Sequence, residues 1–308
     1  MVIKGTKLLL NGEPIYLKMA LYQGYWVDSL WTAPSDADIK RDMELTLEMG
    51  FNSLRLHQKL EDPRLIYWAD QLGVLVWGEI ANCGDSGRAK QRLAQEWGEA
   101  VRRDRNHPSI IAWTPLNESW GTGDLSQKDN QEWVKSIYYL TKGLDPTRPI
   151  SENDGWEHVI TDICSIHDYS QPDIFATHYP EKEPADLQGF LSNLQIHRKN
   201  YAPGCGYTTG PIMITEWGGW GHYMQDPTVK PDHFKYWGYQ GILYKTFDEV
   251  LDLYEATIKE LVKRKDWISG HCYTEFNDQY QEVNGMLTYD RIPKGDLKRL
   301  KAINDLLN

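Results

Sequence analysis

The chain alternates between short apolar segments and longer amphipathic segments, and this alternation limits its fold more than any other feature. Ser35 precedes an amphipathic segment in which Ile39 and Met43 share one helical face, and Gly50 stands where that helix would end. We predict a helix over 156–167 on the same grounds. We predict strands at 18–22, 53–57, 74–79, 110–118, 149–153, 174–179, 212–217 and 270–276.

Strands that alternate with helices in this way form parallel sheets. Without a Pro- or Ser-rich linker between the units, the pattern predicts one α/β domain over residues 1–308, a (β/α)8 TIM barrel. An N-terminal β-hairpin should precede the barrel, because Asn11-Gly12 lies between two short apolar runs and favours a tight turn. An open doubly wound sheet is the alternative fold. It would need a glycine-rich phosphate loop after its first strand, and residues 19–26 contain no G-x-G-x-x-G.

Composition excludes several classes of function. The net charge of −11 disfavours nucleic acids and acidic membrane surfaces as partners. No apolar run has the length of a transmembrane segment, and the first residues lack the pattern of a secretion signal, so the native compartment is left open. The four cysteines form no C-x-x-C pair, and H-E-x-x-H and EF-hand spacings are missing. We therefore expect no cofactor and no metal.

The predicted strand ends are rich in carboxylates, and active residues of parallel barrels lie at the carboxyl ends of the strands. Glu118 and Glu216 stand out because each ends a strongly strand-like segment. Paired carboxylates break glycosidic bonds, one as the proton donor and the other as the nucleophile or base. Such a mouth also suits oxygen-ligated metal chemistry, for which Glu79, His178 and Glu275 would have to converge.

Several runs resemble the barrel of glycoside hydrolase family 2, in the expected order from about residue 9 to the C-terminus. They include Arg55-Leu56-His57, Trp77-Gly78-Glu79, Arg105-Asn106-His107-Pro108, Asn117-Glu118-Ser119-Trp120, Thr215-Glu216-Trp217-Gly218 and Tyr273-Thr274-Glu275-Phe276-Asn277-Asp278.

The resemblance implies hydrolysis of a terminal β-linked sugar with net retention, with Glu216 as nucleophile and Glu118 as acid/base. The two carboxyl groups would then lie about 5–5.5 Å apart. Arg55 would favour the charged form of Glu216, whereas Glu118 would need a raised pKa to act as an acid.

Further residues are candidates for binding the sugar. Asn117 matches the family amide that bonds the hydroxyl next to the reacting carbon. His57 either contacts the sugar or supports Arg55, and many tryptophans of such a chain serve only as packing. The other candidates are His178 and Tyr179, expected at the end of the sixth strand, together with Trp120, Trp217 and Glu275.

The sequence also departs from the family. Relatives usually carry β-sandwich domains ahead of the barrel, and we expect none of them within residues 1–308. Thr274 stands where many relatives have Trp, and Gly78 where many have an acidic residue. Among galactosidase, glucuronidase and mannosidase activities we favour β-galactosidase. A glucuronidase would need cations to bind the sugar carboxylate, and the predicted strand ends carry no basic cluster. A non-catalytic carbohydrate-binding barrel and a metal-dependent barrel lyase or isomerase are the alternatives, and the oligomeric state is not predicted.

Overall fold

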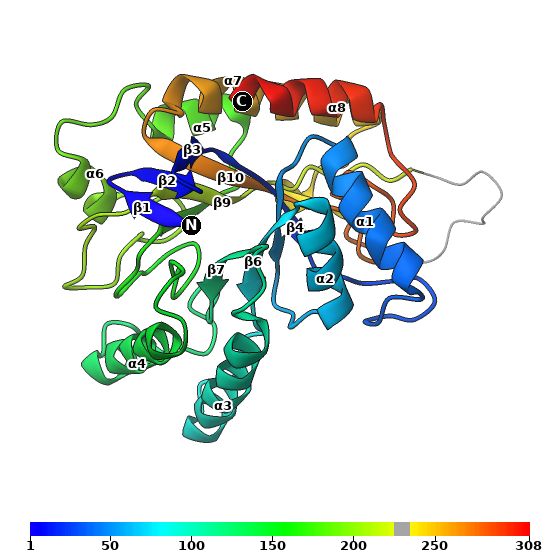
Figure 1. The fold of residues 1–308 in the computed structure, drawn as a ribbon. Helices are drawn as coiled ribbons and strands as arrows, with labels where there is room; N and C mark the ends of the chain where they lie inside the picture. Colours follow the sequence, from blue (N-terminus) through cyan, green and yellow to red (C-terminus); the bar gives the residue numbers. More distant parts are fainter. Residues whose placement is uncertain (225–234) are drawn as a thin grey trace.

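The computed structural model describes residues 1–224 and 235–308, and a curled parallel sheet lies at its centre (Figure 1). The hydrogen-bonded order of its strands is β7-β6-β5-β4-β10-β9-β8. The strands are β4 (Leu17–Tyr22), β5 (Ser53–Leu56), β6 (Leu75–Glu79), β7 (Ile110–Thr114), β8 (Cys164–Asp168), β9 (Ile212–Gly218) and β10 (Ile268–Thr274).

The two edge strands, β7 and β8, are connected through an extended segment rather than through a regular strand. Ile150 bridges to Trp113 of β7 in parallel, and the Ile150 carbonyl accepts a hydrogen bond from Asp162 N, 2.9 Å away. Asp154 bridges in parallel to Asn117 further along. The predicted fifth strand at 149–153 is therefore present as an extended segment that pairs with β7 and bonds to Asp162 ahead of β8, but not as a regular strand.

The predicted sixth strand is wrong. Residues 174–179 belong largely to a helix, α5 (Pro172–His178), and the strand is β8, which overlaps the end of the segment 156–167 that we predicted as a helix. Pro172 occupies the first turn of α5, a position that suits proline because its missing N–H would have no helical partner. The sixth strand therefore ends with His167 and Asp168 and not with His178 and Tyr179.

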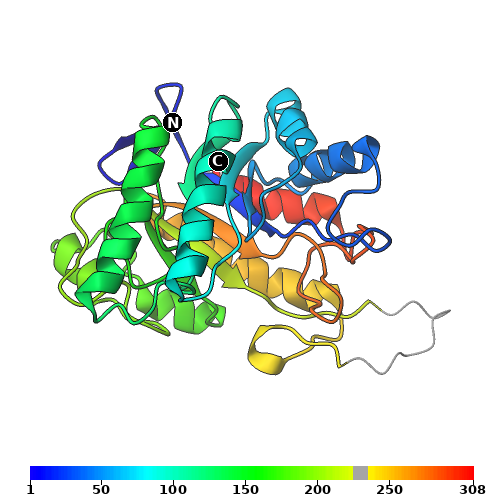
Figure 2. The same ribbon diagram turned by 90° about the horizontal axis from the view of Figure 1, so that it is seen from below.

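The remaining described helices lie outside the sheet (Figure 1). They are α1 (Asp36–Glu48), α2 (Pro63–Leu72), α3 (Gly87–Asp104), α4 (Lys128–Leu144), α6 (Leu187–Asn193), α7 (Phe247–Arg264) and α8 (Leu297–Asn304), with short 3-10 turns at Tyr239–Gly241 and Asp305–Leu307. Seen from below, α3 and α4 run side by side (Figure 2). As predicted, Ser35 caps α1, where its side chain accepts a hydrogen bond from Asp38 N. None of the helices in the two described stretches is both long and apolar enough to span a membrane.

A small antiparallel sheet precedes the barrel, made of β1 (Val2–Lys4), β2 (Lys7–Leu10) and β3 (Glu13–Ile15). The predicted hairpin is confirmed: Leu10 pairs with Glu13, and Asn11 and Gly12 have φ values of 54° and 92°. Side chains of this sheet pack on a core cluster that includes Met19, Trp77 and Met213 of the strands. The hairpin thus covers one end of the barrel interior.

Neighbouring strand residues face opposite sides of the sheet, and this decides which side chains can reach the site. Trp113 packs edge-on against Trp97 of α3, with ring centroids 5.6 Å apart. Trp217 packs in the same outer layer against Tyr254 of α7, at 5.0 Å. Glu216, one residue before Trp217, consequently points to the barrel interior.

Candidate active site

Arg55, at the end of β5, organises the polar centre of the barrel. Its guanidinium is fully buried and donates to Glu216 Oε1 at 2.9 Å and to Glu79 Oε2 at 2.9 Å. A third bond, of 2.7 Å, runs from Nη2 to Asn117 Oδ1. Although burial opposes the charge, Asp154 and the neighbouring glutamates raise the pKa of Arg55, so it is a fixed cation among carboxylates.

The loop after β7 presents Glu118 through an uncommon backbone conformation. Glu118 and Ser119 have φ values of 54° and 60°, in the left-handed region that non-glycine residues rarely adopt. Glu118 N donates to Asp154 O at 2.9 Å, and Ser119 N donates to Asn153 Oδ1 at 2.9 Å. These bonds hold a conformation that costs backbone energy, as is common at functional sites.

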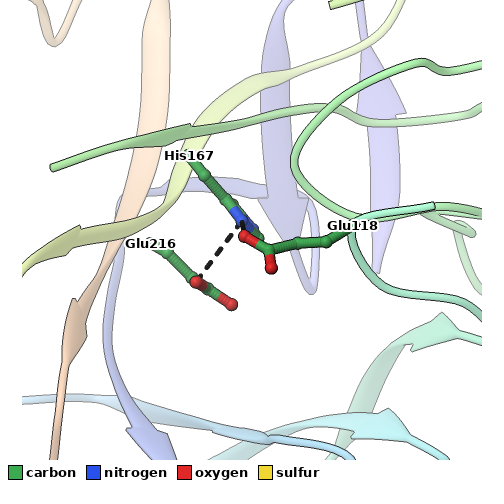
Figure 3. Close-up of side chains that lie close together, drawn as sticks. All are labelled: Glu118, His167 and Glu216. Carbon is green, nitrogen blue, oxygen red and sulfur yellow. Dashed lines mark hydrogen bonds and ion pairs between the residues drawn. The ribbon is translucent and has the colours of Figure 1, made fainter. Parts of the chain in front are cut away.

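His167, from β8, lies between the two glutamates (Figure 3). Its Nδ1 is 2.8 Å from Glu118 Oε1 and 3.3 Å from Glu216 Oε2. On the other side of the ring, Nε2 is 2.7 Å from Asp154 Oδ1. One atom each of Glu118, His167 and Glu216 lie within 4.8 Å of one another, so three separate segments bring their functional groups to one point.

The charges of this cluster set the protonation of its members. Burial lowers the pKa of His167, but Glu216, Asp154 and Glu118 outweigh burial and raise it to about 10. For Glu118, burial works toward a higher pKa, yet its hydrogen bond with the charged His167 lowers the value below the ordinary 4.5. The expectation of a raised pKa for Glu118 is therefore wrong for the unliganded site, because sequence reasoning did not place a cation beside it.

Tyr169 and Tyr239 make a second support for Glu216 that sequence reasoning missed. The Tyr169 hydroxyl donates to Glu216 Oε2 at 2.6 Å. The rings of Tyr169 and Tyr239 stack with centroids 4.1 Å apart and planes 2° apart. The spacing His167-Asp168-Tyr169, in which alternate residues share one face of a strand, is the signal that a correct β8 would have supplied.

Two predicted sugar-binding residues lie at this cluster or beside it. His57 Nδ1 is 3.3 Å from Glu79 Oε1 and 3.8 Å from Glu216 Oε1. Trp120, two residues after Glu118, is 62% exposed, and its indole is open to solvent.

Three other candidates lie elsewhere: one is buried in the outer layer of the barrel, and two are bonded to Asp168. Trp217 is 1% exposed and belongs to the outer aromatic layer, so the structure places it away from the barrel interior. His178 and Tyr179, on and after α5, both bond to Asp168 Oδ2, at 2.7 and 3.1 Å. They do not border the carboxylate pair, because the strand that was expected to carry them is a helix.

Glu275, the last candidate, belongs to an acidic group in the loop after β10. It is fully buried and accepts a bond from Gln279 Nε2 at 3.1 Å. Burial, followed by the charges of Glu282 and Asp278, raises its pKa well above the usual range. Burial also raises the pKa of Glu282 to about 7, and the charge of Glu216 adds to this effect. The alternative metal set is not brought together in the described part of the chain, since Glu79 bonds to Arg55, His178 to Asp168 and Glu275 to Gln279.

The fold and this site define a parallel barrel with paired carboxylates at the ends of its strands. The sequence matches the family described as "Glycosyl hydrolases family 2, TIM barrel domain" over residues 1–308. The chain belongs to this family, as its sequence resemblance implied.

Relatives and solved structures of several activities are similar to the chain. It is 29% identical to a β-galactosidase of Aeromonas hydrophila over 94% of this chain and 27% of that protein. It is 29% identical to a β-glucuronidase of Canis lupus familiaris over 94% of this chain and 43% of that protein. A β-D-glucuronidase structure from Dictyoglomus thermophilum has a TM-score of 0.74 at 19% identity, covering 99% of this chain and 53% of that one. A β-galacturonidase from Eisenbergiella tayi gives 0.69 at 20%, with the same coverage. The chain spans less than half of the length of these two curated relatives.

Proposed function

We propose that residues 1–308 form a single catalytic barrel that hydrolyses a terminal β-linked sugar with net retention, with Glu216 as nucleophile and Glu118 as acid/base. The observation that carries the proposal is the closeness of the two glutamates, whose facing oxygens lie within 4.8 Å. Retaining enzymes hold their carboxyl groups about 5–5.5 Å apart, whereas inverting enzymes need roughly 6.5–9.5 Å to admit a water.

The contacts of each glutamate support this division of roles. Glu216 accepts hydrogen bonds from Arg55 and from Tyr169, at 2.9 and 2.6 Å, and both donors favour a carboxylate that can attack carbon. Glu118 is more accessible, with 22% of its side chain exposed. Glu216 would form a glycosyl ester while Glu118 protonates the leaving oxygen, and Glu118 would then activate the water that breaks the ester.

Arg55 holds Asn117 through Oδ1, so we assign Asn117 Nδ2 as the donor to the sugar hydroxyl next to the reacting carbon. His57 lies close enough to Glu216 to contact the same sugar. The exposed indole of Trp120 suits packing against the C–H face of the substrate.

The charge of the site favours a neutral sugar such as a β-galactoside over a uronic acid. Arg55 forms ion pairs with Glu79, Asp154 and Glu216, so its positive charge is already balanced by carboxylates of the protein. His167 is likewise enclosed by carboxylates. Glu282, near enough to act on the same charges, adds a further acidic group. A sugar carboxylate would meet net repulsion at this end of the barrel.

A panel of chromogenic β-glycosides, run on the wild type and on Glu216→Ala, tests the proposal. The wild type should hydrolyse the neutral members, Glu216→Ala should not, and Glu132→Ala, at a glutamate 66% exposed on α4, should match the wild type. Proton NMR of the first product should show the β-anomer. Equal, slow hydrolysis by wild type and Glu216→Ala would refute the assignment. Sugar binding without turnover would instead indicate a non-catalytic barrel, and activity lost in chelator would indicate metal chemistry.

A further inference from the structure

Both nitrogens of the His167 imidazole face carboxylate oxygens. Nδ1 faces Glu118 at 2.8 Å and Glu216 at 3.3 Å, and Nε2 faces Asp154 at 2.7 Å. With all three carboxylates ionised, each can only accept a hydrogen bond, and we therefore assign a hydrogen to each ring nitrogen. The contacts therefore define an imidazolium, and a ring with both nitrogens engaged as donors has no lone pair to offer a metal ion.

The protein encloses this ring on its remaining sides. Trp156 packs edge-on against it, with ring centroids 5.6 Å apart. Gly155 has a φ of +103°, and a Cβ at this position would lie 2.5 Å from the imidazole. Arg55 stands behind Asp154 at 3.4 Å, so the charged groups that face His167 are three carboxylates backed by one fixed cation.

We propose that His167 stores the acid proton of the first catalytic step and transfers it to Glu118 as Glu216 loses its charge. This inference rests on the proposed function, because it requires Glu216 to become a neutral ester.

The transfer balances in both half-reactions. In the first, the Nδ1–H bond breaks and the proton moves to Glu118, which gives a proton to the glycosidic oxygen. The bond from the anomeric carbon to that oxygen breaks, and a Glu216 oxygen bonds to the carbon. His167 ends neutral, Glu118 ends ionised, and the total charge of the three side chains is unchanged. In the second half, the water oxygen bonds to the anomeric carbon as the ester bond breaks, and the electron pair of the ester bond returns to Glu216. Glu118 takes a proton from this water and passes one to Nδ1, so that all three side chains regain their starting charges.

The timing of the transfer follows from the position of Glu216. Its charge is one of those that raise the pKa of His167 against the effect of burial, and it acts from 3.3 Å. As the ester forms, this attraction disappears and His167 becomes a stronger acid. The proton is thus released when the leaving oxygen needs it, and it is held when the site is empty.

The experiment compares β-galactosides with three leaving groups, 2,4-dinitrophenyl, 4-nitrophenyl and phenyl, across a range of pH. A dinitrophenolate leaves without a proton, whereas a phenolate needs one. For the wild type, the phenyl-to-dinitrophenyl ratio of kcat/KM should hold to about pH 8.5 or above, since His167 keeps its proton there.

In His167→Asn, Glu118 must take its proton from solvent, so this ratio should begin to fall at a lower pH. At about pH 8.5 the phenyl substrate should be slower by roughly 10²–10³-fold, and the dinitrophenyl substrate far less affected. His107→Asn, which removes an imidazole that pairs with Asp70 at 2.6 Å, is the matched control and should keep the wild-type profile.

A purely structural role of His167 would slow all substrates equally at every pH, and that result would overturn the inference while leaving retention and the Glu216→Ala result intact. If His167→Asn does not fold, the wild type alone still tests the inference. A phenyl-to-dinitrophenyl ratio of kcat/KM that already falls near pH 6 would show that His167 does not hold the acid proton. A wild type without turnover on any glycoside would refute the proposed function instead.

Discussion

Arg55→Met should lower the free energy of unfolding markedly, because the guanidinium is the fixed cation among several buried carboxylates. Its side chain is 0% exposed and lies 2.9 Å from both Glu79 and Glu216. Asp154 follows at 3.4 Å. Methionine fills much of the same volume but leaves these charges unpaired in the interior.

Breaking a buried ion pair by removing one partner costs about 3–5 kcal/mol. Arg55 serves more than one carboxylate and also donates to Thr215 O at 3.1 Å, so we expect the upper part of that range. Since folded domains have only about 5–15 kcal/mol of stability, the variant should be close to unfolding. Arg64→Met, at an exposed pair with Asp62, should unfold like the wild type.

Urea unfolding followed by circular dichroism measures the difference, and pH adds a second check. Burial works against ionisation of Asp154, but Arg55 and His167 hold its pKa below the ordinary 3.8. That contribution is present above pH 3.8 and is lost as the pH falls below it, so the gap between wild type and Arg55→Met should narrow in acid. An Arg55→Met chain that unfolds within about 1 kcal/mol of the wild type at neutral pH would refute the charge argument.

Two further outcomes are expected. Tyr169→Phe should fold normally but lower kcat/KM by roughly 10–100-fold, because a hydrogen bond to a charged group contributes about 1.5–3 kcal/mol; unchanged steady-state kinetics would show that the bond to Glu216 has no catalytic value. The rate on a β-glucuronide relative to a β-galactoside should rise as the pH falls through about 7, where Glu282 gains a proton, and it should stay flat in Glu282→Gln. A ratio that varies equally in both proteins would assign the discrimination to another group.

The order of strands and helices was readable from the sequence except at 149–153, which is not a regular strand, and around β8. Cys164–Asp168 is short and places Ser165 and His167 among its apolar residues, so it lacks the continuous apolar run of a buried strand. Residues 174–179 have that apolar character, yet they form most of α5. Proline two residues earlier is a helix-start signal, and giving it more weight than composition would have corrected the assignment.

Because the sixth strand was assigned to the wrong segment, part of the site was not predicted. Glu118 and Glu216 were predictable because the strands that lead to them were correctly located, although β7 ends at Thr114, so that Glu118 lies in the loop after it, and Glu216 lies inside β9. His167 and Tyr169 were not, since a strand assigned to the wrong segment gives no reason to look at them. Trp217 shows a different limit: its type suits sugar stacking, but a residue next to an inward-facing Glu216 must face outward. Alternation along the strand is therefore a stronger guide to a site than residue type.

Arg55 and His167, the two cations that contact Glu216, have residue types that suit different tasks. Arginine is not deprotonated in proteins, so Arg55 supplies a permanent charge that holds Glu79 and Glu216 in place throughout a reaction. Histidine can lose its proton, and its release depends on the charges around it. Because Glu216 contacts both, a change in its charge leaves Arg55 protonated and alters the acidity of His167. The proposed mechanism thus needs a cation of each kind, and under it exchanging the two residue types would remove either the fixed support or the transferable proton.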